Sequence, residues 1–355
     1  MTAKRDKQAV GQRLLAAFRD AGAVEVAPDI LLPAGSLLDL YGEDIRARAY
    51  VTDDPLRGEM MLRPDFTVPV VQAHMANGAE PARYAYLGEV FRKQDHIERR
   101  PEHPRDSEYL QVGYEVFDRD RAAADIEVFA LFHRLLAPFG LTATMGDMAL
   151  IFDAVDGLPL SSPRRAALRH HIWRPQRFRR LIDRFSRPGL ARSFADTAAP
   201  WTGARQPAEM QERIATLTED AAQAPLGAEW HDRMERLSAL SGPAPQALAA
   251  LGELAAEWPA LRAGADRLTA RIAALATSGI DPATVGFDAS LGRQTLEYYD
   301  GFTFTFTAPD HPDWPPVGTG GRYDALTAVL GTGRAIPAVG GIIRPGLVAE
   351  LEASC

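Results

Sequence analysis

The sequence predicts an α+β fold, in which an antiparallel sheet is flanked by helices and carries a helical insertion. Residues 86–91 (YLGEVF) and Glu108–Phe117 (EYLQVGYEVF) mix apolar and polar residues at roughly every second position, as strands do. Residues 302–307 alternate phenylalanine with threonine, which indicates a half-buried strand with one packed aromatic face. Between residues 161 and 278 the strand patterns disappear, and proline-separated runs rich in Ala, Leu, Arg and Glu predict helices.

These patterns divide the chain into three parts. Residues 1–155 and 283–355 form the two parts of the core that contains the sheet, and residues 156–282 form the insertion. A length of 355 residues suits one large domain or two ordinary ones. The chain closes with a predicted strand at 336–343 and a short helix at 344–353, so we expect no further domain after them.

The first elements are a helix and an interrupted strand. Apolar residues recur on one stripe of residues 6–21, and Gly22 favours the end of this helix. Residues 24–35 resemble a strand, but Pro28 and Pro33 suit an edge strand or a junction better than a central strand.

A corner between a strand and a helix is predicted within residues 60–76. Asp65 and Thr67 follow the short apolar strand and precede an apolar helical run. The spacing favours a helix cap as their role. The alternative is a carboxylate and a hydroxyl that face a pocket.

After residue 117 the sequence predicts a further helix and further strands. Residues 118–140 show helical spacing that ends at Pro138, and residues 141–150 resemble a strand. Tyr298 and Tyr299 stand just before the strand at 302–307, where ordinary core aromatics are the simpler explanation. Residues 318–324 (GTGGRYD) predict a glycine-rich loop that allows close approach of a ligand or of another strand.

One basic cluster lies within the predicted insertion. A solvated helix face is the commoner explanation for such a charge run, and contact with a polyanion is the alternative. Its members are His170, His171, Arg174, Arg177, Arg179 and Arg180.

The composition is that of a globular protein with an acidic balance. The apolar content is 46%, the charged content is 24% and the net charge is −8, which argues against nonspecific nucleic-acid binding. The single cysteine, Cys355, excludes an intrachain disulfide and a multi-cysteine metal site. No run approaches the ~20 apolar residues of a membrane span, and no signal peptide is recognisable, so we expect a cytoplasmic protein that binds no membrane.

The hairpin at 86–117 carries the most informative chemistry. Arg92 and Arg105 flank a basic loop that could bind a phosphate or a carboxylate. Gln111 and Glu115 are four residues apart in the second strand, so they lie on one face, and Gly113 between them is expected to leave room for a ligand. An amide and a carboxylate on one surface suit an ammonium group or an imidazole. The alternative is an exposed polar face of the sheet.

Taken together, these segments resemble the catalytic core of class II aminoacyl-tRNA synthetases of the histidyl type. Pro28 stands where that fold carries the proline of its dimer interface, and GEVFRKQD with EYLQVGYEVF resembles its second motif. TLEYYDG and GGRYD are similar to the two segments that line the histidine pocket of that family. The resemblance spans about residues 6–152 and 285–353.

The resemblance implies a histidine pocket, with carboxylates that neutralise the ammonium group and aromatic hydroxyls that bind ring nitrogens. Asp65 and Thr67 match the family's RPEGT segment, with Asp in place of Glu, and Gln111 and Glu115 match the pair that holds the two ends of histidine. Two aromatic segments wall in the ring. The implied ligand-binding residues are Asp65, Thr67, Gln111, Glu115, Tyr298, Tyr299 and Tyr323.

The departures from the synthetase pattern concern its ATP chemistry. Gln294 stands where the family has an arginine before its tyrosines, and Arg293 beside it is expected to point to the opposite face. Gln94 replaces a carboxylate expected near ATP, and Leu347 stands at the arginine of the third motif, with Arg344 displaced. We also expect no anticodon-binding domain, which a synthetase carries after its catalytic core. Because preorganised cations contribute orders of magnitude to such chemistry, we expect no synthetase activity and no catalytic residue.

A synthetase-like core without these parts resembles the regulatory subunits of ATP phosphoribosyltransferase. In that family the subunit joins a short-form catalytic subunit in a hetero-octamer for the first step of histidine biosynthesis. The resemblance implies a homodimer within that assembly, feedback inhibition by L-histidine, activation of the catalytic subunit, and no cofactor, metal or tRNA. The alternatives are a truncated ligase that activates an amino acid with ATP, and a scaffold with an empty pocket. The contact surface, the histidine affinity and the role of the insertion stay open.

Overall fold

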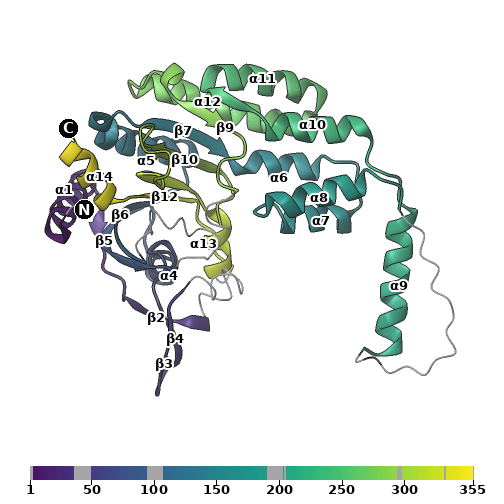
Figure 1. Cartoon of the computed structure of the whole chain (residues 1–355), viewed down its shortest axis with the longest axis horizontal. Coiled ribbons are helices and arrows are strands. Elements are labelled where there is room, and N and C mark those ends of the chain that lie inside the picture. The colour runs from purple at the N-terminus through teal and green to yellow at the C-terminus, as the bar shows by residue number, and fades with distance from the viewer. Residues whose placement is uncertain are drawn as a thin grey trace.

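The computed structural model describes residues 3–35, 49–93, 107–189, 203, 205–293, 298–331 and 333–354. Its described strands form one large sheet of nine strands and a small sheet of three (Figure 1). In spatial order the large sheet contains β1 (Val24–Glu25), β5 (Ala82–Phe91), β6 (Glu108–Phe117), β12 (Ala338–Ile343), β11 (Gly318–Arg322), β10 (Phe302–Thr307), β7 (Thr142–Asp147), β9 (Gly286–Asp288) and β8 (Ser241–Pro243).

Neighbouring strands of the large sheet are antiparallel except at two pairs. The short edge strand β1 runs parallel to β5, and β9 runs parallel to β7. All other pairs, including the long β5–β6 hairpin, are antiparallel. The predicted α+β class is therefore confirmed, with parallel pairing added near both edges.

Helices cover the two faces of the sheet unequally. On the face that carries Tyr114 lie α1 (Lys4–Asp20), α5 (Arg121–Leu136) and α14 (Pro345–Ser354). On the side of the neighbouring Glu115 lies α4 (Thr67–Asn77), which contacts α13 (Asp324–Leu330). Since successive residues of a strand point to opposite faces, β6 contributes Tyr114 to the aromatic core and Glu115 to the other side.

Aromatic rings fill the space between α5 and the sheet. Phe129 and Phe132 of α5 contact Phe304 at 5.7 and 5.3 Å between ring centroids, and Phe18 of α1 stacks on Phe132 at 5.5 Å. The predicted aromatic face of β10 is thus present. The strand is not half-buried, however, because Thr303 and Thr305 on its other face are also buried.

The glycine-rich segment at 318–324 is a strand rather than the predicted loop. Gly318–Arg322 form β11, between β10 and β12. A Cβ atom on Gly320 would lie 2.3 Å from the carbonyl oxygen of Gly340 and 2.4 Å from Phe304, which no side chain tolerates. These glycines therefore serve close packing of the sheet, one of the two uses expected for them.

The segment at 24–35 joins both sheets. It forms β1 at the edge of the large sheet and then β2 (Leu31–Pro33) in the small one. The small sheet is completed by β4 (Gly58–Leu62) and β3 (Val51–Asp54), in the order β2–β4–β3. As the prolines predict, neither piece of the segment is a central strand.

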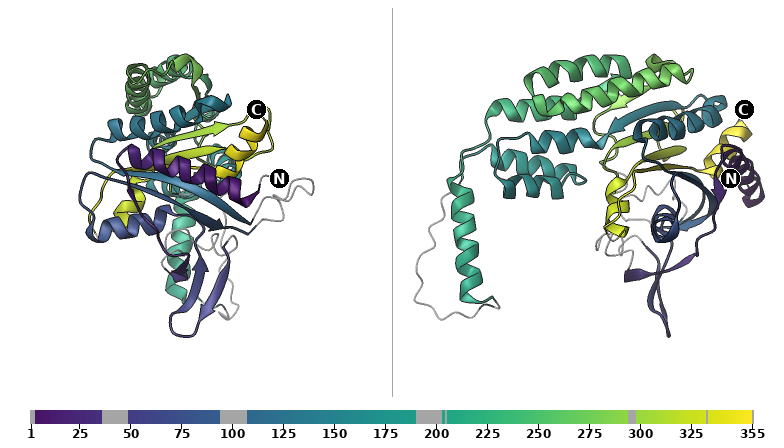
Figure 2. Two further views of the ribbon diagram at one scale, coloured as in Figure 1. Left: turned by 90° about the vertical axis from the view of Figure 1, so that its left-hand side faces the viewer. Right: turned by 180° about the vertical axis from the view of Figure 1, so that it is seen from behind.

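Within the described residues of the predicted insertion the regular elements are helices, apart from β8, whose three residues pair with β9 at the sheet edge. Helix α9 projects away from the other elements over most of its length in Figures 1 and 2, and none of its residues is buried, but Asp220 near its C-terminal end accepts a hydrogen bond from Arg164 of α7 at 2.6 Å. The elements of this region and its junctions are α6 (Met148–Asp156), α7 (Ser162–His170), α8 (Pro175–Phe185), α9 (Pro207–Ala222), α10 (Ala228–Ser238), α11 (Ala244–Glu257) and α12 (Arg262–Thr277), with short 3-10 turns at Pro259–Leu261 and Pro282–Thr284 and another, Ala137–Phe139, after α5.

Candidate functional site

The carboxylate of Glu115 is the centre of a buried polar cluster on β6. The hydroxyl of Thr67 donates to Oε1 at 2.8 Å, and the hydroxyl of Tyr86 donates to the same oxygen at 3.0 Å. The hydroxyl of Tyr323 donates to Oε2 at 2.6 Å. Glu115 itself is only 1% exposed, so these three neutral donors replace the water that a free carboxylate would bind.

Three separate chain segments bring these donors together. Thr67 is the first residue of α4, Tyr86 lies on β5, and Tyr323 follows β11. The neighbouring strand β12 makes room, because a Cβ atom on Gly340 would lie 1.6 Å from Oε2 of Glu115. The buried position of the carboxylate thus requires glycine at that point of the adjacent strand.

The space above Gly113 is occupied by Tyr86, which corrects the expectation that this glycine leaves room for a ligand. The two residues pair across β5 and β6, and a Cβ atom on Gly113 would lie 2.2 Å from the Tyr86 ring. Phe66 stacks on the other side of that ring at 4.2 Å between centroids. Gly113 therefore admits a protein side chain, which delivers its hydroxyl to Glu115.

Burial dominates the electrostatics of the cluster. It raises the pKa of Glu115 to about 7, although hydrogen bonds from Tyr323, Thr67 and Tyr86 oppose the shift. The negative charge of Asp65 adds to the rise. For Tyr323 and Tyr86, burial and the nearby Glu115 charge raise the pKa well above its ordinary value, so both stay protonated as donors.

Asp65 and Thr67 were expected to act either as a helix cap or as polar groups that face a pocket, and the structure gives each residue a different role. Asp65 contributes to the cap of α4: it precedes the N-cap residue Phe66, and its Oδ1 accepts the backbone N–H of Val68 at 3.3 Å. Thr67 instead turns its hydroxyl to Glu115. Both residues are buried, so the cap also holds a second carboxylate close to Glu115.

Gln111 and the tyrosines before β10 border the same region. Gln111 is 3% exposed, and its Oε1 has no hydrogen-bond partner in the described structure. Burial, with the charges of Glu115 and Asp65, raises the pKa of the Tyr299 hydroxyl. The Tyr298 ring lies 5.1 Å from that of Tyr299 and 6.0 Å from that of Tyr323, so the three aromatic residues are neighbours.

The predicted anion-binding residues are only partly described. Arg92 donates from Nε to the carbonyl oxygen of Pro64 at 2.8 Å, next to the start of α4. Arg105, Gln94 and Gln294 lie outside the described residues. Leu347, at the position of the arginine in the synthetase third motif, lies within α14.

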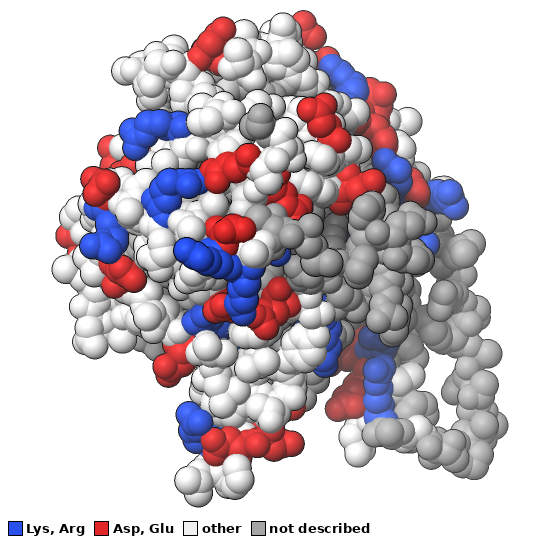
Figure 3. All heavy atoms as spheres, turned by 60° about the vertical axis from the view of Figure 1, so that its left-hand side comes forward, with Lys and Arg blue, Asp and Glu red and all other residues white. Residues whose placement is uncertain are grey.

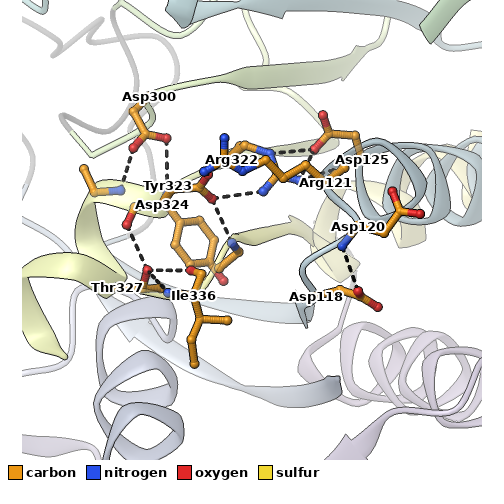
Figure 4. A network of polar contacts seen from close by, with 12 residues as sticks. Asp118, Asp120, Arg121, Asp125, Asp300, Arg322, Tyr323, Asp324, Thr327 and Ile336 are labelled. Atoms are coloured by element: carbon orange, nitrogen blue, oxygen red, sulfur yellow. Dashed lines mark hydrogen bonds and ion pairs between the residues drawn. The ribbon is translucent and has the colours of Figure 1, made fainter. Parts of the chain in front are cut away.

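The segment that carries Tyr323 is held by a network of ion pairs and hydrogen bonds (Figure 4). Arg322 binds Asp125 of α5 through Nη2 at 2.6 Å and Asp324 through Nη1 at 2.9 Å. Asp324 also accepts the backbone N–H of Ala338 at 2.8 Å, and Asp300 accepts the N–H of Asp324 at 3.1 Å. The backbone on both sides of Tyr323 is therefore fixed, and its hydroxyl is aimed at Glu115.

Two other buried carboxylates, Asp125 and Asp147, have cationic partners. Asp147 pairs with Arg271 at 2.7 Å and with Arg267 at 3.0 Å. Burial alone would raise the pKa of Asp147, but these two guanidinium groups more than offset it and place the pKa below its ordinary value. Glu115, in contrast, receives its three hydrogen bonds from neutral hydroxyls. The arrangement can therefore accept a cation brought by a ligand.

Sequence reasoning missed Tyr86. Its position at the start of a strand indicates nothing about the site, because only the pairing of β5 with β6 places it across Gly113. A prediction of the strand register could have identified Tyr86, because the correct register places this aromatic residue directly opposite a glycine.

The molecular surface and the remaining polar clusters add little to this site. On the described part of the face in Figure 3, positive and negative side chains are interspersed, without the broad basic surface typical of nucleic-acid binding. No group of three possible metal ligands and no helix long and apolar enough to cross a membrane occurs among the described residues.

The sequence of this chain is similar to those of two related groups of known proteins. The family model described as histidyl-tRNA synthetase matches residues 2–345. An ATP phosphoribosyltransferase regulatory subunit of Agrobacterium fabrum is 34% identical, over 92% of both chains, and one of Rhizobium rhizogenes is 31% identical, over 92% of this chain and 93% of the relative.

Solved structures support the fold. A structure described as an ATP phosphoribosyltransferase regulatory subunit/histidyl-tRNA synthetase from Bacillus halodurans matches 98% of this chain and 79% of its own, with a TM-score of 0.71 at 19% identity. Histidyl-tRNA synthetase from Nostoc matches 100% of this chain and 74% of its own, with a TM-score of 0.64 at 15% identity. The chain has the fold of histidyl-tRNA synthetases and belongs to the family of ATP phosphoribosyltransferase regulatory subunits.

Proposed function

We propose that this chain binds L-histidine at the Glu115 cluster and that the bound histidine lowers the activity of a short-form ATP phosphoribosyltransferase catalytic subunit. Without histidine the chain would activate that subunit, within a hetero-octamer built from its own dimers. The chain itself would carry no catalytic residue. Membership of the regulatory-subunit family supports the partner, and the chemistry of the cluster supports the ligand.

The observation that carries the proposal is the uncompensated charge of Glu115. A buried carboxylate whose donors in the described structure are all hydroxyls, beside the second carboxylate of Asp65, is costly when ionised. A ligand with an ammonium group would remove that cost. Oε1 of Gln111, which is buried without a hydrogen-bond partner, would accept one further N–H from the same ligand.

The aromatic residues suit the other end of histidine. Tyr298, Tyr299 and Tyr323 lie together next to the carboxylate, and their hydroxyls can pair with imidazole nitrogens. An apolar wall with a few polar groups is the usual composition of a small-molecule pocket. Histidine would meet both requirements with one molecule.

Inhibition requires that histidine binds more tightly to one state of the complex than to another. The energy available for the change equals that difference in affinity, and the partner must shift histidine affinity by the same factor. We therefore expect histidine to bind the chain with different affinity when the catalytic subunit is present.

The test is calorimetric titration of the purified chain with histidine, and separately with ATP and magnesium. We expect histidine to bind and Glu115→Gln to weaken binding by about 2 kcal/mol or more, the scale of one charge-assisted buried interaction. Glu127→Gln is the matched control, because Glu127 also accepts a tyrosine hydroxyl, that of Tyr114 at 2.7 Å, but on the opposite face of β6.

The second half of the test adds the chain to a short-form catalytic subunit. We expect higher activity without histidine and loss of that gain with it, and Glu115→Gln should keep the activation but resist histidine. Histidine binding that is equal in wild type and Glu115→Gln would refute the assigned site. Pyrophosphate release from ATP would instead identify an amino-acid ligase.

A further inference from the structure

A second buried charge, on the side of the insertion, has no counter-ion among the residues that the structure describes. Arg293 lies in the turn after β9 and is 7% exposed. Its Nε donates to the carbonyl oxygen of Ile172 at 3.0 Å, and its guanidinium lies 4.8 Å from the centre of the Phe178 ring. Nη2 has no hydrogen-bond partner in the described part of the chain. A buried guanidinium with one carbonyl and one aromatic partner is incompletely neutralised.

This arginine lines a surface hollow of about 340 Å³ between α8 and α10. The hollow is distinct from the Glu115 cluster and shares no residue with it. Its lining residues with charge are Arg179, Arg180, Asp183, Glu235 and Arg293, and Ser238 adds a hydroxyl.

The cations of the hollow exceed what its own carboxylates neutralise. Arg179 pairs with Glu235 at 3.4 Å, but both side chains are largely exposed, so the pair holds weakly. Asp183 is bonded to His231 at 3.1 Å. Arg180 is exposed and has no ion-pair partner among the described residues. Burial lowers the pKa of Arg293, and the nearby positive charge of Arg179 lowers it further.

We propose that this hollow is a binding site for a small phosphate-bearing molecule, with Arg293 at its base and Arg179 and Arg180 at its rim. One guanidinium group can donate two parallel hydrogen bonds to two oxygens of the same phosphate. A phosphate also has further oxygens for arginines that approach from other elements. The volume is at the small end of the range for ligand sites and exceeds that of a single phosphate group. The apolar ring of Phe178 and the side chain of Met234 leave a surface for the rest of such a ligand.

The site would connect the insertion to the core. Arg293 belongs to the segment that leads from β9 towards Tyr299, whereas Phe178 and Arg180 belong to α8. A phosphate held between them would fix α8 against that segment. Occupancy would therefore stabilise the packing of the insertion on the sheet.

The experiment is thermal unfolding of the full chain with inorganic phosphate, pyrophosphate and glucose 6-phosphate, each compared with sodium chloride at equal ionic strength. We expect at least one phosphate compound to raise the Tm of the wild type. Arg293→Met should abolish this rise, Arg293→Lys should retain part of it, and Arg180→Gln should weaken apparent binding by about tenfold, the effect of one lost charge-assisted contact.

Arg184→Gln is the matched control, because Arg184 lies on the same helix but pairs with Asp220 at 3.4 Å and does not line the hollow. It should respond to phosphate as the wild type does. An equal Tm rise in the wild type and Arg293→Met, or no rise with any of the three compounds, would overturn the proposal. Heparin is added as a polyanion in the same assay. If heparin raises the Tm and none of the three phosphate compounds does, the arginines form a polyanion-binding surface and the proposal is wrong. If Arg293→Met does not fold, the comparison of Arg180→Gln with Arg184→Gln decides.

Discussion

At the scale of single residues, the unusual feature is a carboxylate whose partners among the described residues are all hydroxyls. Glu115 accepts from Thr67, Tyr86 and Tyr323, and its pKa is raised to about 7. A hydroxyl can reorient and accept a hydrogen bond from the protonated carboxyl group, so the cluster tolerates both protonation states better than an ion pair would. A site that must exist with and without a cationic ligand needs this tolerance.

The shifted pKa predicts how stability depends on pH. The pKa of Glu115 rises from an ordinary value of 4.5 to about 7 on folding, so the folded chain holds this proton more tightly than the unfolded chain. Its contribution to stability is fully present below pH ~4.5 and is lost as the pH rises through ~7. Relative to Glu115→Gln, the wild type should lose about 2–4 kcal/mol of unfolding free energy between pH 5 and pH 8, by urea denaturation without ligand.

Saturating histidine should reduce that loss in the wild type, because an ammonium group favours the ionised carboxylate. Parallel pH profiles for the wild type and Glu115→Gln would show that Glu115 has an ordinary pKa. They would also remove the electrostatic reason for a cationic ligand.

At the scale of elements, glycines on adjacent strands determine where side chains of the site fit. Gly113 on β6 admits the ring of Tyr86, and Gly340 on β12 admits the carboxylate of Glu115. Gly321 on β11 admits Tyr299, since a Cβ atom there would lie 2.8 Å from its ring. These three glycines thus leave the space in which the side chains of the buried polar cluster lie.

A methyl group at Gly340 should disrupt the cluster. Its Cβ would overlap Oε2 of Glu115, so Gly340→Ala should lower the unfolding free energy by about 1–3 kcal/mol, as overpacking does, and should abolish histidine binding. Gly252→Ala is the control, since Gly252 is exposed within α11 and has no atom within 4 Å of the added Cβ. That helical position should gain about 0.5–1 kcal/mol. Equal stabilities of the two variants in urea denaturation would contradict the packing argument.

At the scale of the whole molecule, one buried charge network joins the core to the insertion. Asp125 of α5 binds Arg322 beside the site at 2.6 Å and Arg271 of α12 at 3.1 Å. Arg271 continues to Asp147 at the end of β7, which Arg267 also binds. The segment that holds Tyr323 and the helices over the sheet edge therefore share a set of buried ion pairs.

Removal of the central carboxylate should have a large effect. Asp125→Asn would leave Arg271 and Arg322 without one of their anionic partners in a buried position, and should cost about 3–5 kcal/mol of unfolding free energy. Because Arg322 also orients Tyr323, histidine affinity should fall as well. Glu257→Gln, which breaks the exposed pair with Arg236 at 2.8 Å, should change neither quantity appreciably. A stability change as small as that of the control would show that the network is dispensable.

Local patterns were enough to predict the strands of the β5–β6 hairpin and helices for most of residues 161–278. Period-two alternation placed Gln111 and Glu115 on one face of a strand, and the resemblance to synthetases indicated Thr67 and Tyr323 as their companions. These features depend on spacing within one segment or on motifs that survive in the sequence. Pairing of distant segments depends on neither.

The tertiary structure therefore decided the contacts between strands, which the spacing of residues within one segment does not determine. The register of β5 on β6 put Tyr86 into the space above Gly113, and the pairing of β12 with β6 placed Gly340 against Glu115. The same assembly made β11 a central strand rather than a loop, because its glycines fit between β10 and β12. A one-residue shift in any of these pairings would turn the participating side chains to the opposite face of the sheet, and contacts between strands set that register.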